Sequence, residues 1–487
     1  MIVSPQRASP VDRFLRLFTD VRAGESPTAL LLTLNVFLLL TAYYVLKVVR
    51  EALILTEFGA EVKAYASAGQ VLMLAAVVPA YGVLAGKVPR RRLINIVTVI
   101  CMGCLGVFYA LGQTGVSLGI VFFVWVGIFN VMIIAQAWAF ANDVYTNDEG
   151  KRLFPLVGFG ASAGAVFGSY ISGAMESVGI TELFLLAAAL LGVALVITNI
   201  VDTRERHRTE GDVDDIKTSG ILPAATEQFR ADSGEFKTVD NAYKVESGSY
   251  NIVDPDADQE PQEKAPQSTG GAMQLVFRSR YLLLIACLIM LLNWVNTTGE
   301  FILGRTVEQA AAAAVADGTA GGLSEQDFVR NFYGGFFSVV NLAALLGQLF
   351  LVSRIIKHLG VKVALLILPV IAFVGYAFLA FFPILVAVRW AKTAENATDY
   401  SLQNTVRNVL FLPTTREEKY KAKQAIDAFF YRAGDLLSAL LVLVGVNVLM
   451  FQAQHFAVFN LVLVAIWIVL AVFIGRRYVR LAAATEQ

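Results

Sequence analysis

Twelve long apolar stretches dominate this chain of 487 residues and restrict it to a membrane-spanning fold. A helix needs about 20 mostly apolar residues to cross the roughly 30 Å hydrocarbon core of a bilayer. The composition agrees, because only 16% of the residues are charged, against about 25% in a soluble domain. We therefore expect an all-α integral membrane protein of about twelve transmembrane helices. The expected spans are 29–50, 64–86, 93–113, 118–141, 153–176, 181–201, 280–302, 331–353, 361–382, 384–407, 424–450 and 456–475.

The spans fall into two groups of six, separated by a segment of different composition. Residues 202–273 carry 16 acidic and 8 basic side chains and are rich in Ser, Gly, Pro and Gln. A segment with so few apolar residues cannot bury a core, so we expect a disordered linker. The predicted parts are an N-terminal segment (1–27), an N-terminal six-helix half (28–201), an acidic cytoplasmic linker (202–277), a C-terminal six-helix half (278–477) and a cytoplasmic tail (478–487).

The positions of Lys and Arg predict the orientation in the membrane. Basic clusters such as 90–92 and 476–480 lie on one side, whereas the opposite loops, such as 114–118 and 451–455, carry almost none. Since basic residues concentrate on the cytoplasmic side, we expect both termini to be cytoplasmic, in a plasma (inner) membrane. Ahead of the first span, apolar residues within 11–21 share one helical face, which predicts an interfacial helix on the membrane surface.

Charged side chains within the predicted spans are the strongest functional signal. A charge near the bilayer centre costs roughly 2.5–3.5 kcal/mol, so such residues usually face a cavity, pair with one another, or both. Cations recur on spans of both halves, which suits an anionic solute. The residues expected to bind it are Lys47, Arg50, Asn142, Glu300, Lys392 and Arg432. The candidates for gating or salt bridges are Glu51, Asp143, Arg389, Glu395, Asp399, Asp427 and Asp435.

The same charges also have structural interpretations. Lys47 and Glu51 are four residues apart, a spacing that allows an ion pair along one helix. Polar residues around Asn142 could equally join helices by hydrogen bonds. Interhelical salt bridges that lock or gate the two halves are at least as favoured as solute contacts for Arg389 and Glu395, and for Asp427 and Arg432.

The fifth span contains glycines four residues apart, at Gly160, Gly164 and Gly168. Small residues at this spacing let two helix backbones approach closely, so we expect a packing contact. The competing interpretation is a glycine-rich phosphate cradle, which requires a strand before the glycines and a helix after them. Here the glycines lie within a span.

Several stretches resemble known families. Two groups of six helices around a cytoplasmic linker resemble the major facilitator superfamily, and GKVPRRR resembles its basic loop between spans two and three, without the usual Asp. The stretches AYYVLKVVREALIL, WAFANDVYTNDEGKRLFPLVGFGA and DYSLQNTVRNVLFLPTTREEKYKAKQAID resemble the nucleotide transporter family, the ATP/ADP translocases of plastids and obligate intracellular bacteria. This resemblance covers most of both halves and excludes the linker.

The resemblance implies roles for particular charges. In that family, a cation late in the first span, a carboxylate in the fourth, another in the seventh and a lysine in the eleventh are associated with nucleotide transport. Arg50 matches the first position and Glu300 the third. The fourth-span carboxylate falls near Val126, and the eleventh-span lysine falls at Asp435, with Arg432 three residues earlier as a replacement cation.

These observations lead to one hypothesis and two alternatives. The hypothesis is a nucleotide transporter, of the ATP/ADP exchange type, that works by alternating access. The alternatives are an ion-coupled carrier of another organic anion or lipid, and a non-transporting receptor or scaffold that uses the acidic linker. We expect no enzymatic activity, cofactor or metal site, because Walker A and zinc spacings are missing. We expect no nucleic-acid partner, because the formal net charge is zero. The expected partners are a small anionic solute and the lipid bilayer, with the protein as a monomer.

Overall fold

The computed structural model describes residues 19–22, 25–175, 178–218, 272–415 and 418–485, and every regular element within them is helical. Nine helices in this part of the chain are long and apolar enough to cross a membrane. Two of these are 60 and 57 residues long, about three times the length that one crossing needs. The N-terminal half consists of α2 (Ser26–Lys87), α3 (Arg90–Gly112), α4 (Gly119–Val144), α5 (Asn147–Ala174) and α6 (Glu182–Thr218).

Helix α2 crosses the membrane twice because Gly59 interrupts it. Gly59 has φ 82° and ψ 172°, a backbone conformation that is essentially restricted to glycine. The backbone N–H of Ala60 donates a hydrogen bond of 2.9 Å to the carboxylate of Glu308, which caps the second part of the helix. The expected first and second spans are therefore the two parts of α2.

The C-terminal half repeats this arrangement. Helix α10 (Glu325–Gly347) continues through the π-helical η2 (Gln348–Val352) into α11 (Ser353–Phe381). Gly360 interrupts α11 with φ 74° and ψ 166°. The other elements here are α8 (Ala272–Arg278), α9 (Arg280–Ala316), α12 (Leu385–Thr398), η3 (Asp399–Gln403), α13 (Asn404–Val409), η4 (Glu418–Ala422), α14 (Lys423–Ala425), η5 (Ile426–Phe430), α15 (Tyr431–Asn447) and α16 (Ala453–Thr485).

The tenth expected span is formed by α12, η3 and α13, although its composition does not mark it as a membrane span. It carries Arg389, Lys392, Glu395 and Asp399. Neighbouring helices bury Lys392 and Glu395, which are 1% and 5% exposed. With this segment and the two interrupted helices, the described chain makes twelve crossings, six in each half.

Helix α5 packs against α2 through the glycines of the fifth span. A methyl group on Gly160 would lie 2.6 Å from the carbonyl oxygen of Thr33, and Gly164 and Gly168 face the carbonyls of Phe37 and Thr41 in the same way. No side chain fits between the two backbones at these points. The packing interpretation is confirmed, and the glycines leave no space for a phosphate.

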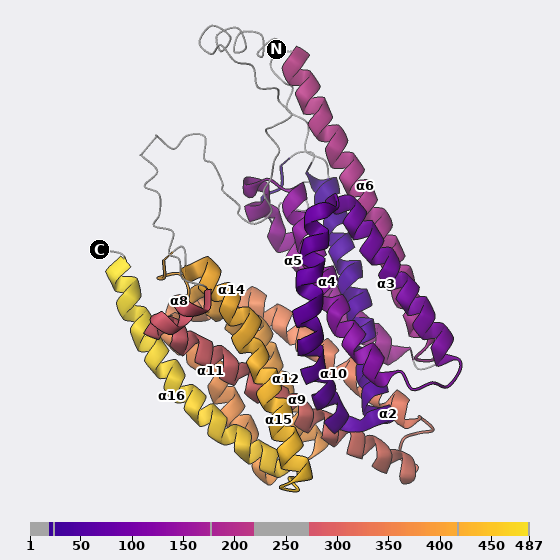
Figure 1. Cartoon of the computed structure of the whole chain (residues 1–487), viewed down its shortest axis with the longest axis vertical. Coiled ribbons are helices and arrows are strands. Elements are labelled where there is room, and N and C mark those ends of the chain that lie inside the picture. The colour runs from indigo at the N-terminus through magenta and orange to yellow at the C-terminus, as the bar shows by residue number, and fades with distance from the viewer. Residues whose placement is uncertain (1–18, 23–24, 176–177, 219–271, 416–417, 486–487) are drawn as a thin grey trace.

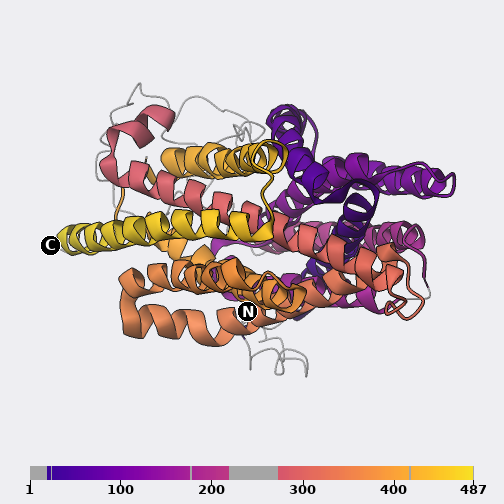
Figure 2. The same ribbon diagram turned by 90° about the horizontal axis from the view of Figure 1, so that it is seen from below.

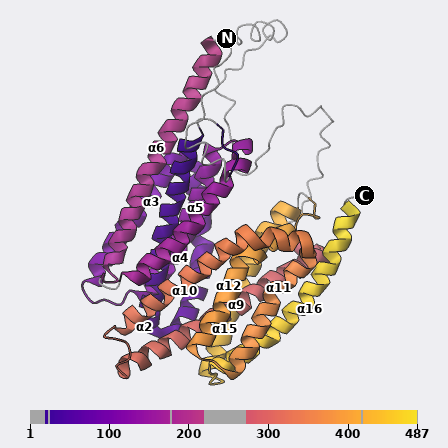
Figure 3. The same cartoon turned by 180° about the vertical axis from the view of Figure 1, so that it is seen from behind.

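The two halves lie side by side and diverge toward one end. Figures 1 and 3 show them in contact at the end opposite the marked C-terminus and separated at the end where α6 and α16 finish. Figure 2 shows them on either side of a shared interface. The contact includes α5 and α10, where the Asn341 amide donates to the Ser169 hydroxyl at 3.4 Å. We call the joined end the Gly59 side and the separated end the terminal side.

Helix boundaries around the expected linker differ from the prediction. Helix α6 ends at Thr218 rather than near 201, and α8 (Ala272–Arg278) begins inside the predicted linker and ends one residue beyond it. The prediction relied on low apolar content, but Arg, Glu and Lys are good helix formers in water, so a helix can continue beyond the bilayer. Residues 219–271 and most of the predicted interfacial helix at 11–21 lie outside the described residues.

Candidate functional site between the two halves

The N-terminal half contributes a buried charge triad. Glu51 is 1% exposed, and its carboxylate lies 2.5 Å from both the Arg50 guanidinium and the Lys63 ammonium. The tight turn at Gly59 brings Lys63, in the second part of α2, against the first part. The structural alternative of an ion pair between Lys47 and Glu51 does not form, because Arg50 and Lys63 pair with this carboxylate. The sequence prediction missed Lys63, which lies one residue before the expected second span.

The C-terminal half contributes a second buried network around Lys392 of α12. Its ammonium donates to the Asn296 side-chain oxygen at 2.8 Å. It also lies 3.1 Å from the Glu395 carboxylate and 3.6 Å from that of Glu300 on α9. Asn396 donates to Glu300 at 2.9 Å. Lys392 is thus held by two carboxylates and an amide, and it links α12 to α9.

Arg432 and Asp435 form a third polar group on α15. Their side chains lie 3.3 Å apart. The Asp435 carboxylate also accepts hydrogen bonds from Asn293 at 2.8 Å and Thr297 at 2.9 Å, both on α9. Asp435 therefore joins α15 to α9, while part of the Arg432 guanidinium stays open, with 33% of its side chain exposed.

Lys47 differs from the other cations because it pairs with no carboxylate among the described residues. Its ammonium lies 4.1 Å from the ring centre of Phe337, 5.1 Å from that of Tyr44 and 6.0 Å from that of Tyr400. Cation–π contacts at such distances are weaker than an ion pair. Its charge is therefore free to interact with a bound anion.

These groups surround one cavity between the two halves. Its volume is about 220 Å³, somewhat below the roughly 300–1,000 Å³ typical of small-molecule sites. Four cations and three carboxylates line it, so its formal charge is positive. Its walls are formed by Lys47, Arg50, Glu51, Lys63, Ser67, Gln70, Phe123, Asn293, Asn296, Thr297, Glu300, Phe337, Tyr400, Tyr431, Arg432 and Asp435.

Contacts between the halves close this cavity on the Gly59 side. Besides the Ala60–Glu308 hydrogen bond, Asn447 donates to Tyr65 at 3.0 Å. The buried guanidinium of Arg330 on α10 donates to the Val178 carbonyl at 2.6 Å. On the other side of the cavity, toward the terminal side, the two halves diverge (Figure 1).

Other predicted site residues lie away from the cavity. Asn142 is exposed near the end of α4 on the terminal side and does not line the cavity, and neighbouring Asp143 pairs with Arg90 at 2.5 Å. Arg389 stacks on the Phe332 ring of α10 at 5.5 Å.

Three of the four residues considered for interhelical salt bridges form local ion pairs instead. Among the described residues, Glu395 pairs with Lys392, and Arg432 pairs with Asp435, each three positions away. Asp427 pairs with Lys423, four positions away, at 3.7 Å. At these spacings two side chains meet on the face of one helix, which satisfies the charge locally.

Asp399 opens the π-helical η3 and forms no salt bridge within the described part of the chain. It is 9% exposed, and its Oδ1 is buried without a hydrogen-bond partner there. Both polar side-chain atoms of Gln403, at the end of η3, are also buried without a hydrogen-bond partner among the described residues. Single π-helical turns are frequent at functional sites. Tyr400, one residue after Asp399, lines the central cavity.

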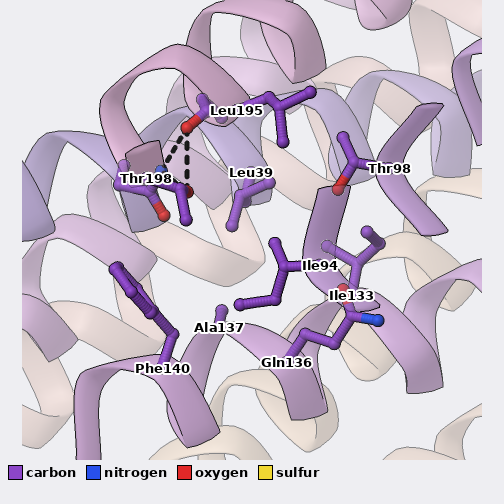
Figure 4. A pocket seen from close by; sticks show the side chains of 11 residues that line it. Leu39, Ile94, Thr98, Ile133, Gln136, Ala137, Phe140, Leu195 and Thr198 are labelled. Atoms are coloured by element: carbon purple, nitrogen blue, oxygen red, sulfur yellow. Dashed lines mark hydrogen bonds between the residues drawn. The ribbon is translucent and has the colours of Figure 1, made fainter. Parts of the chain in front are cut away.

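A second, much smaller cavity lies inside the N-terminal half (Figure 4). It encloses about 20 Å³ among mainly apolar side chains, including Leu39, Ile94 and Phe140. Gln136 reaches its wall, and neither polar atom of that side chain has a hydrogen-bond partner among the described residues. The space suffices for about one water molecule and is too small for a solute.

The fold and the central cavity between two six-helix halves define a membrane transport protein. A model of the Major Facilitator Superfamily matches residues 32–394. That range covers well over half of the chain, which therefore belongs to this superfamily and is a transporter rather than an enzyme. Proteins of this class act as secondary transporters by alternating access. No curated protein matches the sequence.

Solved structures of the same fold are distant in sequence. A bacterial homologue of the human lysosomal transporter Spinster, solved inward-facing and unoccupied, has 12% identity, a TM-score of 0.55, and coverage of 94% of this chain and 98% of that one. A POT family transporter in complex with 5-aminolevulinic acid has 12% identity and a TM-score of 0.55, with coverage of 93% of this chain and 96% of that one. The nucleoside transporter NupG has 14% identity and a TM-score of 0.55, with coverage of 91% of this chain and 98% of that one. These likenesses establish the fold and leave the solute open.

Proposed function

We propose that this transporter carries a small phosphate-bearing anion of the nucleotide class, bound in the central cavity. The observation that carries the proposal is Lys47, a cation on the cavity wall without a carboxylate partner in the described structure. Arg432 lies on the opposite half with its guanidinium partly open. An anion between them would receive charge from both halves at once.

The cavity supplies the two kinds of group that a nucleotide needs. Cationic side chains form short, charge-assisted hydrogen bonds with phosphate oxygens. The aromatic side chains of Phe123, Phe337, Tyr400 and Tyr431 offer surfaces on which a base can stack. Since the cavity is small, we expect a nucleoside monophosphate to fit with less separation of the halves than ATP requires.

The proposed orientation follows from the basic loops. We place the terminal side, including the ends of α6 and α16, in the cytoplasm of a cell with a plasma (inner) membrane. The structure would then be inward-facing, and the transporter would work as a monomer. The fully buried Arg330 and the capped Ala60 form the closed outer gate.

Uptake into proteoliposomes tests the substrate. Purified protein would be assayed with radiolabelled AMP, ADP, ATP and glucose 6-phosphate, with adenosine as the uncharged comparison. We expect saturable uptake of at least one phosphate-bearing compound and none of adenosine. Lys47→Gln should lower the apparent affinity by about tenfold, the loss expected for one charge-assisted contact. Saturable adenosine uptake without phosphate uptake would contradict the proposal.

An ion-coupled carrier of another organic anion is the second candidate, favoured by Glu300 and Asp435 on the cavity wall. A carboxylate beside the solute can bind a proton and so couple its movement to transport. An imposed pH gradient separates the two candidates. Exchange of one nucleotide for another requires internal nucleotide and no gradient, whereas coupled uptake responds to the gradient and proceeds into empty vesicles.

A further inference from the structure

A basic hollow lies at the terminal end of α16 and shares no lining residue with the central cavity. Its volume is about 610 Å³. Three arginines line one part of it, and apolar side chains line the rest. The lining residues are Leu284, Phe473, Arg476, Arg477, Arg480 and Leu481.

The three arginines lack counter-charges within the described part of the chain. Each is exposed, and no carboxylate described in the structure forms an ion pair with any of them. Arg476 and Arg480 are four residues apart on α16, so they lie on the same face. Three guanidinium groups so close together repel one another, and a bound anion would remove that repulsion.

The apolar part of the hollow points to the kind of anion. Phe473 is 58% exposed on α16, one turn before Arg476. It falls within the expected span 456–475, so we expect its exposed ring to face lipid. Leu284, near the start of α9, forms the other apolar wall. A ligand that fits this surface combines a phosphate group with a hydrocarbon chain.

We propose that this hollow, between α9 and α16, binds the headgroup of an anionic phospholipid from the adjacent leaflet. The planar guanidinium groups of Arg476, Arg477 and Arg480 would hold the phosphate by paired hydrogen bonds, and an acyl chain would lie over Phe473. Basic pockets between transmembrane helices bind anionic headgroups in this way. The bound lipid would anchor the last helix of the C-terminal half at the membrane surface while the halves move.

Native mass spectrometry of the full-length protein tests this site with two lipids of identical acyl chains, phosphatidylglycerol and phosphatidylcholine. We expect phosphatidylglycerol to bind the wild-type protein at about tenfold lower concentration than phosphatidylcholine, as charge-assisted contacts imply. The triple variant Arg476→Gln, Arg477→Gln, Arg480→Gln should lose this preference, and the single exposed change Arg480→Gln should reduce it.

The matched control removes three exposed basic side chains elsewhere on the terminal side, by Lys87→Gln, Arg354→Gln and Lys357→Gln. It should keep the preference. Equal binding of both lipids to the wild type, or equal loss in the control and the α16 variants, would overturn the proposal. Displacement of the lipid by soluble glycerol phosphate at equal concentration would also overturn it, because the site would then take a free phosphate compound.

Discussion

Two lysines on α2 show how the same residue type serves stability at one position and solute binding at another. Lys63 is 7% exposed and paired with the buried Glu51, whereas Lys47 contacts aromatic rings beside the cavity. Removing one partner of a buried ion pair costs roughly 3–5 kcal/mol. Since Arg50 continues to pair with Glu51, the loss at Lys63 should fall at or below the lower end of that range.

We therefore predict that Lys63→Gln lowers the melting temperature clearly and that Lys47→Gln leaves it nearly unchanged. Thermal unfolding of the two purified variants, followed by tryptophan fluorescence, measures the difference. Lys47→Gln should instead impair solute uptake while the protein remains folded. A melting temperature that falls equally in both variants would mean that Lys47 has a structural role, contrary to our assignment.

A pH dependence follows from the ion pair between Glu25 and Arg152 at the terminal side, 2.8 Å long. Burial raises the pKa of Glu25, but hydrogen bonds from Arg152 and from the Arg22 backbone, together with their charges, outweigh burial and hold the pKa below its ordinary value of 4.5. A lowered folded-state pKa stabilises the protein above the unfolded-state pKa, and this contribution is lost as the pH falls through the folded-state value.

Glu25→Gln should therefore lower the melting temperature at about pH 7, and the difference from wild type should shrink below about pH 4.5. Glu325→Gln, which removes an exposed carboxylate at the start of α10, serves as the matched control. A difference between wild type and Glu25→Gln that stays constant down to about pH 3 would show that the pair does not titrate as the geometry implies.

At the scale of elements, the contact between α2 and α5 depends on the absence of side chains. A methyl group on Gly164 would collide with the Phe37 carbonyl, whereas a methyl on Gly158 of the same helix would meet nothing within 4 Å. Overpacking of this kind typically costs about 1–3 kcal/mol. Gly164→Ala should therefore lower the melting temperature, and Gly158→Ala should not. Equal effects in a thermal shift assay would disprove the close contact.

The sequence predicted the elements better than their charge partners. Apolar length located all twelve crossings, including the tenth, although that span carries Arg389 and Lys392. The triad at Glu51 was missed because Lys63 reaches it only through the backbone turn at Gly59, and no side-chain pattern encodes that geometry. The local pairs of Asp427 and Arg432 were missed because the partners considered for them lay on other helices. In the structure, Asp427 pairs with a residue four positions away and Arg432 with one three positions away.

At the scale of the whole molecule, the two halves bring separate charge networks to the central cavity. The triad at Glu51 belongs to one half, whereas the networks at Lys392 and Asp435 belong to the other. A phosphate group between Lys47 and Arg432 would attract both halves toward it. The contacts at Ala60 and Arg330 oppose opening on the Gly59 side. A bound anion can shift the equilibrium between the conformation open on the terminal side and the one open on the Gly59 side only if it binds one of them more tightly than the other.

Distances between spin labels on the two halves, with and without AMP or ATP, test this account most directly. One pair, at Lys87 and Lys357, reports the terminal side, and the other, at Val116 and Thr319, reports the Gly59 side. We predict that a bound nucleotide shortens the first distance and lengthens the second, and that Lys47→Gln abolishes both changes. Distances that do not respond to either nucleotide, or that respond equally in Lys47→Gln, would contradict a phosphate-bearing solute bound at Lys47 between two alternating halves.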